Sequence, residues 1–232
     1  MAKSVGAVEE RLVRVPAGPA RLEGNLSLPE GARAVVLFAH GSGSSRYSSR
    51  NRHVARLLNE AKLATLLIDL LTSDEEAIDA RTAHLRFDIA LLEERLVGAT
   101  DWLVQYSDMR SLPIGYFGAS TGAAAALVAA AERPDHVHAV VSRGGRPDLA
   151  GSALPYVRAP TLLIVGGNDV QVIQLNRAAL AQLPCEKQLA IVPGATHLFE
   201  EPGALDEVAR LAHRWFEQHL FSAAQRVSGV NG

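Results

Sequence analysis

A serine stands between two glycines where the sequence changes from a strand pattern to a helix pattern. The segment Gly118-Ala-Ser-Thr-Gly122 follows the apolar run 113–117 and opens the alanine-rich stretch 121–133. A G-x-S-x-G turn lifts the serine hydroxyl above a sheet, and it needs small flanking residues because side chains there would collide with neighbouring backbone. Free N–H groups at the helix start add partial positive charge. The pattern favours Ser120 as a nucleophile, although in isolation it also fits a helix cap or a phosphate-holding turn.

A serine hydroxyl needs a base, and the base needs an acid that orients it. Asp169 follows the apolar run 161–165 in a Gly-Gly-Asn-Asp loop, and His197 follows the run 187–192 in a Gly-Ala-Thr-His loop. Each residue alone also fits a turn or a surface loop. Together they occur in the order serine, acid, histidine, each after a strand, which predicts a catalytic triad.

The other histidines and carboxylates fit this pattern less well. The remaining histidines precede the serine, flank an internal strand or fall in the last helix: His40, His53, His84, His136, His138, His213 and His219. Asp148, Glu200 and Glu201 are alternative acids, but none follows the strand before the histidine loop as Asp169 does.

A fourth strand end is followed by the loop His40-Gly-Ser-Gly-Ser-Ser-Arg46. Attack on a carbonyl creates an oxyanion that needs preorganised N–H donors, and glycine-rich loops leave such donors free. We expect the backbone N–H groups of Ser42 and Thr121 to form this oxyanion hole. A plain Gly/Ser loop is the alternative; a Walker A loop is excluded because its G-x-x-x-x-G-K-[ST] spacing is absent.

The elements that must position these residues are strands that alternate with helices. Alternating or continuous apolar runs predict strands at 11–15, 20–28, 34–39, 64–69, 113–117, 137–141, 161–165 and 187–192. Helical stretches are expected at 52–60, 87–106, 121–133, 174–183 and 205–220. An N-terminal hairpin followed by strand–helix units predicts an α/β fold: a mostly parallel, doubly wound sheet of about eight strands with an antiparallel edge. Catalytic groups in such sheets lie beyond the carboxyl ends of the strands.

With these motifs the chain resembles the α/β-hydrolase superfamily, and within it the small dienelactone-hydrolase-like members. The resemblance covers roughly residues 10 to 220 and rests on His40-Gly-Ser-Gly, Gly118-Ala-Ser-Thr-Gly122, Gly166-Gly-Asn-Asp169 and Gly194-Ala-Thr-His197. Dienelactone hydrolases proper carry a cysteine nucleophile, whereas this chain has Ser120. Its one cysteine, Cys185, lies away from the motifs. The resemblance therefore implies ester or lactone hydrolysis, without dienelactone itself as the expected substrate.

Several features bear on the substrate. Residues 142–160, where this superfamily usually inserts a lid, are too few for a separate cap domain. We therefore expect an open, shallow site for small soluble acyl substrates.

Arg46 and Arg143 follow strand ends and could meet a substrate carboxylate, although solvated loop charges are the commoner role. The acidic run 73–76 is expected to be a solvated face or a helix start. The same triad would serve a thioesterase, an acyltransferase or an amidase, and a non-catalytic hydrolase-fold ligand sensor or scaffold is a further alternative.

Composition supports an ordinary globular chain of one domain. Its 232 residues are 48% apolar and 21% charged, with a net charge of −2, and they include no basic run that would indicate nucleic-acid binding. We expect one domain over residues 1–221 and a flexible tail over 222–232. The start of the chain lacks an apolar signal-peptide run, which together with the single thiol suggests a cytoplasmic location. We expect no cofactor, metal, membrane or nucleic acid as a partner, and the chain could form a homodimer.

Overall fold

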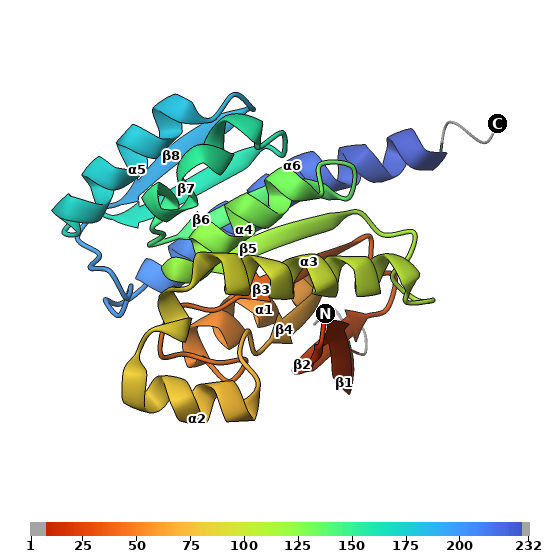
Figure 1. Ribbon diagram of the computed structural model, residues 1–232. Coiled ribbons are helices and arrows are strands. Elements are labelled where there is room, and N and C mark those ends of the chain that lie inside the picture. Colours follow the sequence, from red (N-terminus) through yellow and green to blue (C-terminus); the bar gives the residue numbers. More distant parts are fainter. Residues whose placement is uncertain (1–7, 229–232) are drawn as a thin grey trace.

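The central sheet consists of strands that are largely buried on both faces. The computed structural model describes the backbone of residues 8–228 and the side chains of residues 8–221. Within this part of the chain, eight strands form one sheet in the order β1-β2-β4-β3-β5-β6-β7-β8 (Figure 1). The strands span Val8–Ala17, Ala20–Pro29, Ala34–Ala39, Leu63–Ile68, Ile114–Ala119, Val137–Arg143, Thr161–Gly166 and Lys187–Val192, from β1 to β8. Every residue of β3, β4, β5 and β7 is buried.

Strand pairing confirms the predicted fold class. The hairpin β1–β2 and the pair β2–β4 are antiparallel, and the remaining neighbours from β4 to β8 are parallel. The register places Gly118 of β5 beside Ala39 of β3 on one side and beside Ser142 of β6 on the other. The carboxyl ends of these three strands therefore meet at one edge of the sheet, where catalytic groups were expected.

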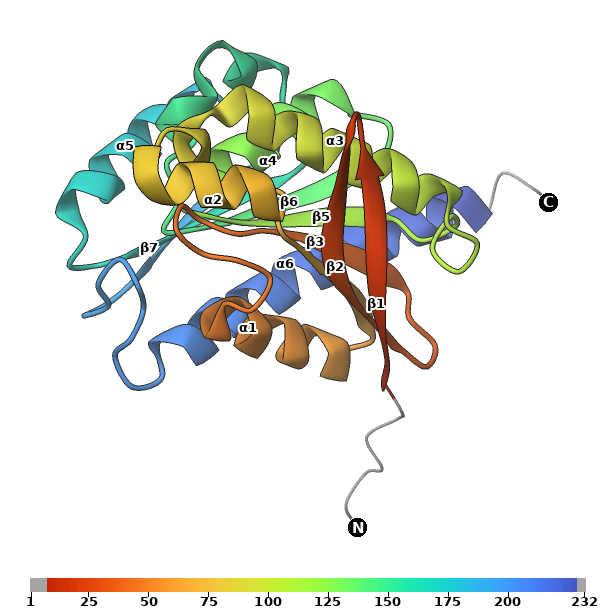
Figure 2. The same cartoon turned by 60° about the horizontal axis from the view of Figure 1, so that its bottom comes forward.

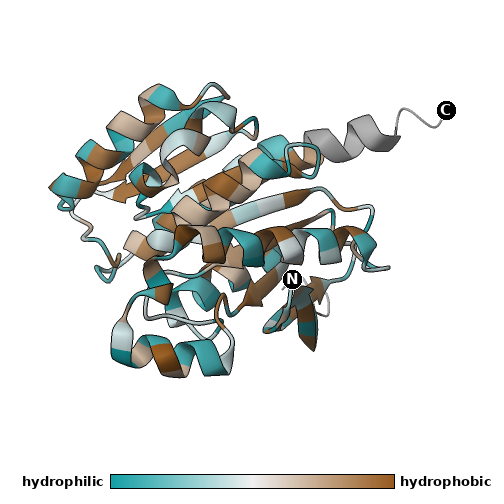
Figure 3. Ribbon diagram, viewed as in Figure 1, coloured by the Kyte–Doolittle hydropathy of each residue, from teal (hydrophilic) through white to brown (hydrophobic). Residues whose placement is uncertain are grey.

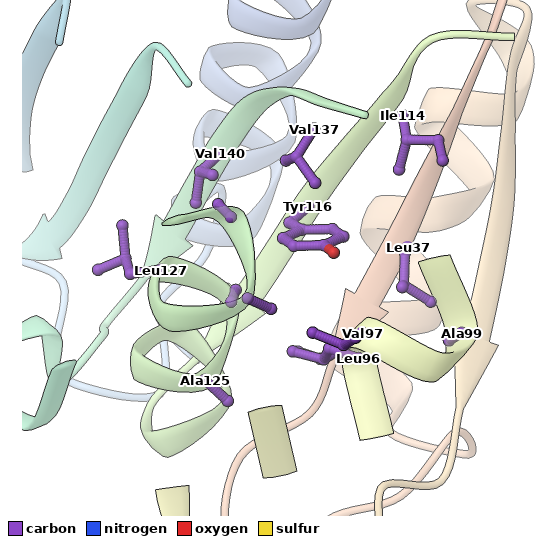
Figure 4. Close-up of a cluster of buried hydrophobic side chains, with 14 of the residues drawn as sticks. Leu37, Leu96, Val97, Ala99, Ile114, Tyr116, Ala125, Leu127, Val137 and Val140 are labelled. Atoms are coloured by element: carbon purple, nitrogen blue, oxygen red, sulfur yellow. The ribbon is translucent and has the colours of Figure 1, made fainter. Parts of the chain in front are cut away.

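Helices cover both faces of the sheet (Figures 1 and 2). Two clusters of buried apolar side chains mark the two layers: one includes residues of α3, α4 and α5, and the other includes residues of α1 and α6. In the first cluster, Tyr116 of β5 lies among aliphatic side chains (Figure 4). Its buried hydroxyl forms a hydrogen bond with Thr100, so the polar atom is not left unsatisfied in the core.

The helices agree with the predicted ones, with additions. Helices α1 to α6 span Ser49–Glu60, Ser73–Thr82, Ile89–Gln105, Thr121–Glu132, Val170–Gln182 and Ala204–Ser228, and two 3-10 segments, η1 and η2, span Leu85–Phe87 and Pro147–Tyr156. We expected a tail from Ser222, but α6 continues through Ser228, because Ala223, Ala224, Gln225 and Arg226 are good helix formers with no Gly or Pro before Gly229. Residues 1–7, where a signal peptide would begin, and tail residues 229–232 lie outside the described residues.

Helix α2 is the element that the sequence left undecided. The acidic run 73–76 forms its first turn, where the Thr72 hydroxyl and the Glu75 carboxylate form a capping box. The helix is mostly hydrophilic (Figure 3), and none of its residues belongs to either core cluster. It is attached by polar contacts instead: Glu75 with Arg95 at 2.8 Å, and Asp79 with Arg86. As for membranes, no helix among the described residues is long and apolar enough to cross one.

Candidate active site

Ser120 occupies a strained turn between β5 and α4. Its backbone has φ +50° and ψ −121°, a conformation that residues with a side chain rarely adopt. The turn is fixed from both sides, because the Ser120 N–H donates to the carbonyl of Arg143 (3.4 Å) and the Ser120 carbonyl accepts from the N–H of Arg146 (3.1 Å).

The glycines of the elbow are required by close backbone packing. A Cβ atom on Gly122 would lie 2.4 Å from the carbonyl oxygens of both Ala39 and His40, and one on Gly118 would lie 2.5 Å from the Cα of Ala123. Without a side chain at Gly122, α4 can approach the end of β3, and without one at Gly118, α4 can turn back closely against β5. The Gly-x-Ser-x-Gly spacing is thus explained by packing, which leaves Ser120 at the edge of the sheet.

Asp169 and His197 are held together by their loops. Nδ1 of His197 lies 2.6 Å from Oδ2 of Asp169. The two loops are also joined through Asn168, whose N–H donates to the Ala195 carbonyl (2.9 Å) and whose side-chain amide donates to the Gly194 carbonyl (2.8 Å). A carboxylate accepts, so Nδ1 carries the proton and Nε2 is left available as a base.

The histidine loop extends over the end of β6, next to the serine. A Cβ on Gly144 would lie 3.6 Å from Cε1 of the His197 ring, and Gly144 directly follows Arg143, whose carbonyl accepts from Ser120. The fold therefore brings Ser120, Asp169 and His197 to the carboxyl ends of β5, β7 and β8. A nucleophile, its base and the orienting acid must share one edge of the sheet in this way.

The loop after β3 packs against the serine turn. A Cβ on Gly41 would lie 3.0 Å from the Cβ of Ser120, and Ser42 and Thr121 line the same cavity. Thr121 is the first residue of α4, so its N–H has no intrahelical acceptor. The Ser42 N–H has no backbone acceptor among the described residues either. Both expected oxyanion donors therefore lie beside Ser120 with their N–H groups free.

His40, which the sequence did not single out, positions this loop. Its Nε2 accepts from the Leu70 N–H at 3.0 Å, so the proton is on Nδ1, which lies 2.9 Å from the Gly41 carbonyl oxygen and donates to it. The Gly41 carbonyl and the Ser42 N–H belong to one planar peptide and point in opposite directions. His40 therefore orients the Ser42 N–H. Burial lowers the pKa of His40, which keeps the ring neutral and able to accept.

The two arginines considered for a substrate carboxylate are already engaged. Arg46 forms ion pairs with Asp69 and, at 2.6 Å, with Glu23. Arg143 is only 6% exposed and donates to the Oδ1 of Asn51 at 3.2 Å. Burial, together with the charge of nearby Arg50, lowers the pKa of Arg143 to about 10. Neither guanidinium is among the residues that line the cavity beside Ser42.

The sequence did not reveal that cavity, which adjoins the site: Ser42 and Thr121 line it, whereas Ser120, Asp169 and His197 do not. It has a volume of about 370 Å³ and lies between the loop after β3, the end of β4 and helix α2. We expected an open, shallow site because residues 142–160 leave no room for a cap. The cover on this side comes instead from the segment after β4. As for metal ligands, the described residues contain no group of three or more His, Cys, Asp or Glu side chains that could hold an ion.

The fold is that of an α/β-hydrolase. The model of the dienelactone hydrolase family matches residues 22–222, and the chain belongs to that family. A solved dienelactone hydrolase from Anabaena variabilis is 66% identical, with a TM-score of 0.91 over 92% of this chain and 99% of that one. Est1E from Butyrivibrio proteoclasticus is 16% identical, with a TM-score of 0.74 over 89% of this chain and 98% of that one, which shows the shared fold.

Curated relatives are considerably longer. A Mycobacterium tuberculosis protein whose name proposes phosphoribosyl transferase activity is 60% identical over 208 residues. The match covers 90% of this chain but 46% of that protein, so the chain spans about half the length of the curated relatives that it matches. The family model and the solved dienelactone hydrolase both match this chain and indicate a hydrolase.

Proposed function

We propose that this hydrolase cleaves carboxylic ester or lactone bonds of small substrates through an acyl-enzyme on Ser120. The observation that carries the proposal is the strained Ser120 turn at the same sheet edge as the 2.6 Å contact between His197 and Asp169. A strained turn that exposes a serine next to an oriented imidazole has a direct use in nucleophilic catalysis. A serine that only capped the helix would need neither the strained turn nor the nearby imidazole. Its side chain would accept a hydrogen bond from a helix N–H, and Ser120 forms no such cap hydrogen bond.

The proposed reaction uses only side chains and backbone groups of the site. Nε2 of His197 takes the hydroxyl proton as Ser120 Oγ attacks the acyl carbonyl, and Asp169 stabilises the imidazolium that forms. The N–H groups of Ser42 and Thr121 donate to the oxyanion. The imidazolium then protonates the leaving alcohol, and a water molecule, activated by His197 in the same way, releases the acid and restores Ser120.

A fluorophosphonate probe tests the nucleophile without knowledge of the substrate, since it phosphonylates only a serine activated by a base and an oxyanion hole. We expect stoichiometric labelling at Ser120, read by intact mass and peptide mapping. Ser120→Ala should abolish labelling, whereas Ser152→Ala, an exposed serine of η2, should not change it. Folded protein that stays unlabelled would contradict the proposal.

The bond type needs a second measurement, because thioesters and amides can react with the same triad. A matched panel of an oxygen ester, a thioester and an amide of one acyl group separates these reactions by kcat/KM. We expect the oxygen ester to react fastest. Labelling without turnover of any of the three would favour a ligand-binding role for the folded site. The phosphoribosyl transfer in the name of the longer relatives concerns proteins of which this chain matches less than half.

A further inference from the structure

The cavity beside the oxyanion loop lies on one particular side of Ser120. Its walls are residues 40–45 after β3, residues 69–71 after β4, part of α2, Arg86, Leu92 and Thr121. In the sheet, β3 and β4 lie on one side of β5, whereas β7 and β8, which carry Asp169 and His197, lie on the other side. The cavity is therefore across the nucleophile from the histidine.

This position identifies the part of the substrate that the cavity would hold. The leaving alcohol must depart next to His197, because that imidazolium protonates it. With the carbonyl oxygen between the Ser42 and Thr121 N–H groups, the acyl chain extends to the opposite side. The cavity on that side is large enough for a short acyl group of several non-hydrogen atoms.

The cavity wall carries more negative than positive charge. Three carboxylates line it, and two of them are neutralised: Asp69 by Arg46, and Asp79 by Arg86. The third, Glu76, has no ion-pair partner among the described residues. Glu76 and His40 line the same cavity, so the carboxylate faces the space that adjoins the oxyanion loop.

The one arginine that lines the cavity does not reverse this balance. Arg86 donates from Nε to Oδ2 of Asp79, from its backbone N–H to Oδ1 (3.1 Å) and from Nη2 to the Asp79 carbonyl (3.1 Å). Asp79 is buried, and although burial acts to raise its pKa, the Arg86 hydrogen bonds and charge hold the pKa below its usual range. The Arg86 charge is therefore compensated at its own position, and Glu76 remains as the excess charge.

The rest of the wall beside the oxyanion loop is polar but uncharged. Thr121, the first residue of α4, lines the cavity. The hydroxyl-bearing side chains of Ser42, Ser44 and Ser45 line the same wall.

We propose that this cavity holds the acyl part of the substrate and selects uncharged or positively charged acyl groups over acyl groups that end in a carboxylate. The proposal rests on the ester hydrolysis proposed above. Glu76 is the specificity-determining residue: it repels a second carboxylate and attracts a cation, and it takes no part in the bond cleavage.

The test uses 4-nitrophenyl esters of three acids of similar length: pentanoic acid, glutaric acid as its monoester, and 4-(trimethylammonio)butanoic acid. At low salt we expect kcat/KM for the glutarate ester to be about fivefold to tenfold below that for pentanoate, and the cationic ester to react at least as fast as pentanoate. Because Glu76 is exposed, the difference should shrink at 0.5 M salt.

Glu76→Gln should raise kcat/KM for the glutarate ester severalfold and leave pentanoate unchanged. Asp74→Asn is the matched control: it removes the same charge from the first turn of the same helix, at a residue that does not line the cavity. Equal rates for glutarate and pentanoate in the wild type, or equal effects of the two variants, would overturn the charge selection alone. No turnover of any ester with Ser120 unlabelled would overturn the proposed function and this inference with it.

Discussion

Nδ1 of His197 and Oδ2 of Asp169 lie 2.6 Å apart, and this contact leaves Nε2 as the ring nitrogen available to Ser120 in the proposed reaction. An amide in place of the carboxylate would present a donor to Nδ1 and favour the opposite tautomer, with the proton on Nε2. The ring would keep its position but lose its function as a base.

We therefore expect Asp169→Asn to lower ester kcat by about 10³- to 10⁴-fold, with little change in fold. Ester turnover and circular dichroism check this. Asp206→Asn is the control, because it alters an equally close His–Asp pair, His53 with Asp206 at 2.7 Å, on helices α1 and α6. Similar losses in both variants would show that the Asp169 contact is structural.

His40 supplies two separable contacts, one to Leu70 and one to the Gly41 carbonyl. The side-chain amide of Asn can replace the Nδ1 donor but does not reach Leu70, whereas the longer Gln side chain places its amide near the Nε2 position. We expect His40→Gln to slow fluorophosphonate labelling of Ser120 by about 10- to 100-fold, because the Ser42 N–H loses its orientation. His40→Asn should label faster than His40→Gln but unfold more easily. The reverse order of labelling rates would contradict the role given to His40.

The carboxyl groups of Glu93 on α3 and Glu132 on α4 interact, which raises the pKa of Glu93 and lowers that of Glu132. Burial, followed by a hydrogen bond with Glu132 and the charge of Glu132, raises the pKa of Glu93 to about 7. Since the unfolded pKa is near 4.5, the folded state binds the extra proton, and the stability that it adds is present below pH 4.5 and lost as the pH rises to about 7.

Glu93→Gln keeps a donor toward Glu132 at every pH. After a discount for solvent screening, we expect the variant to be more stable than wild type by about 1 kcal/mol at pH 8 and equal to it near pH 4.5, in urea titrations. Glu30→Gln, at an exposed glutamate of the turn after β2, is the control. The lowered pKa of His40 gives the opposite trend, with stability lost below about pH 6.5, so variants are compared at each pH. If the difference in unfolding free energy between variant and wild type were the same at pH 4.5 and pH 8, the raised pKa of Glu93 would be contradicted.

Gly122 allows β3 and α4 to touch. Gly122→Ala would press a methyl group against two carbonyl oxygens, and we expect a loss of more than about 3 kcal/mol in unfolding free energy, or failure to fold. Gly31→Ala is the comparison that tests backbone strain without a steric clash, because Gly31 has φ +72° but no atom near its Cβ position. The loss in unfolding free energy should therefore be about 1 kcal/mol. Urea titration measures both, and equal losses would show that the close approach is not the reason for glycine.

The fold, and the position of Ser120, Asp169 and His197 at one edge of the sheet, were predictable because their signals are local in the sequence. Apolar runs define the strands, and a parallel sheet collects the residues that follow them at one edge, so Ser120, Asp169 and His197 could be placed together without a structure. The C-terminal end of α4 followed from Pro134, which cannot continue a helix.

The surroundings of the triad were not predictable in the same way. His40 precedes the serine and has no pattern of its own; its role depends on Leu70, which only the pairing of β3 with β4 brings near. Arg46 and Arg143 follow strand ends as a substrate-binding residue would, yet their partners Asp69 and Asn51 come from other segments. The cavity depends on α2, whose apolar periodicity is too weak to indicate what it covers.

Helix α2 contributes a wall of the cavity but no apolar residue to the core clusters, and Glu75 and Asp79 attach it through Arg95 and Arg86. Substitutions at its other positions can therefore accumulate at little cost to folding. Relatives with the same sheet can acquire different substrate preferences through this one helix, and a library over residues 73–82 that keeps Glu75 and Asp79 would explore new substrates while the rest of the scaffold stays intact.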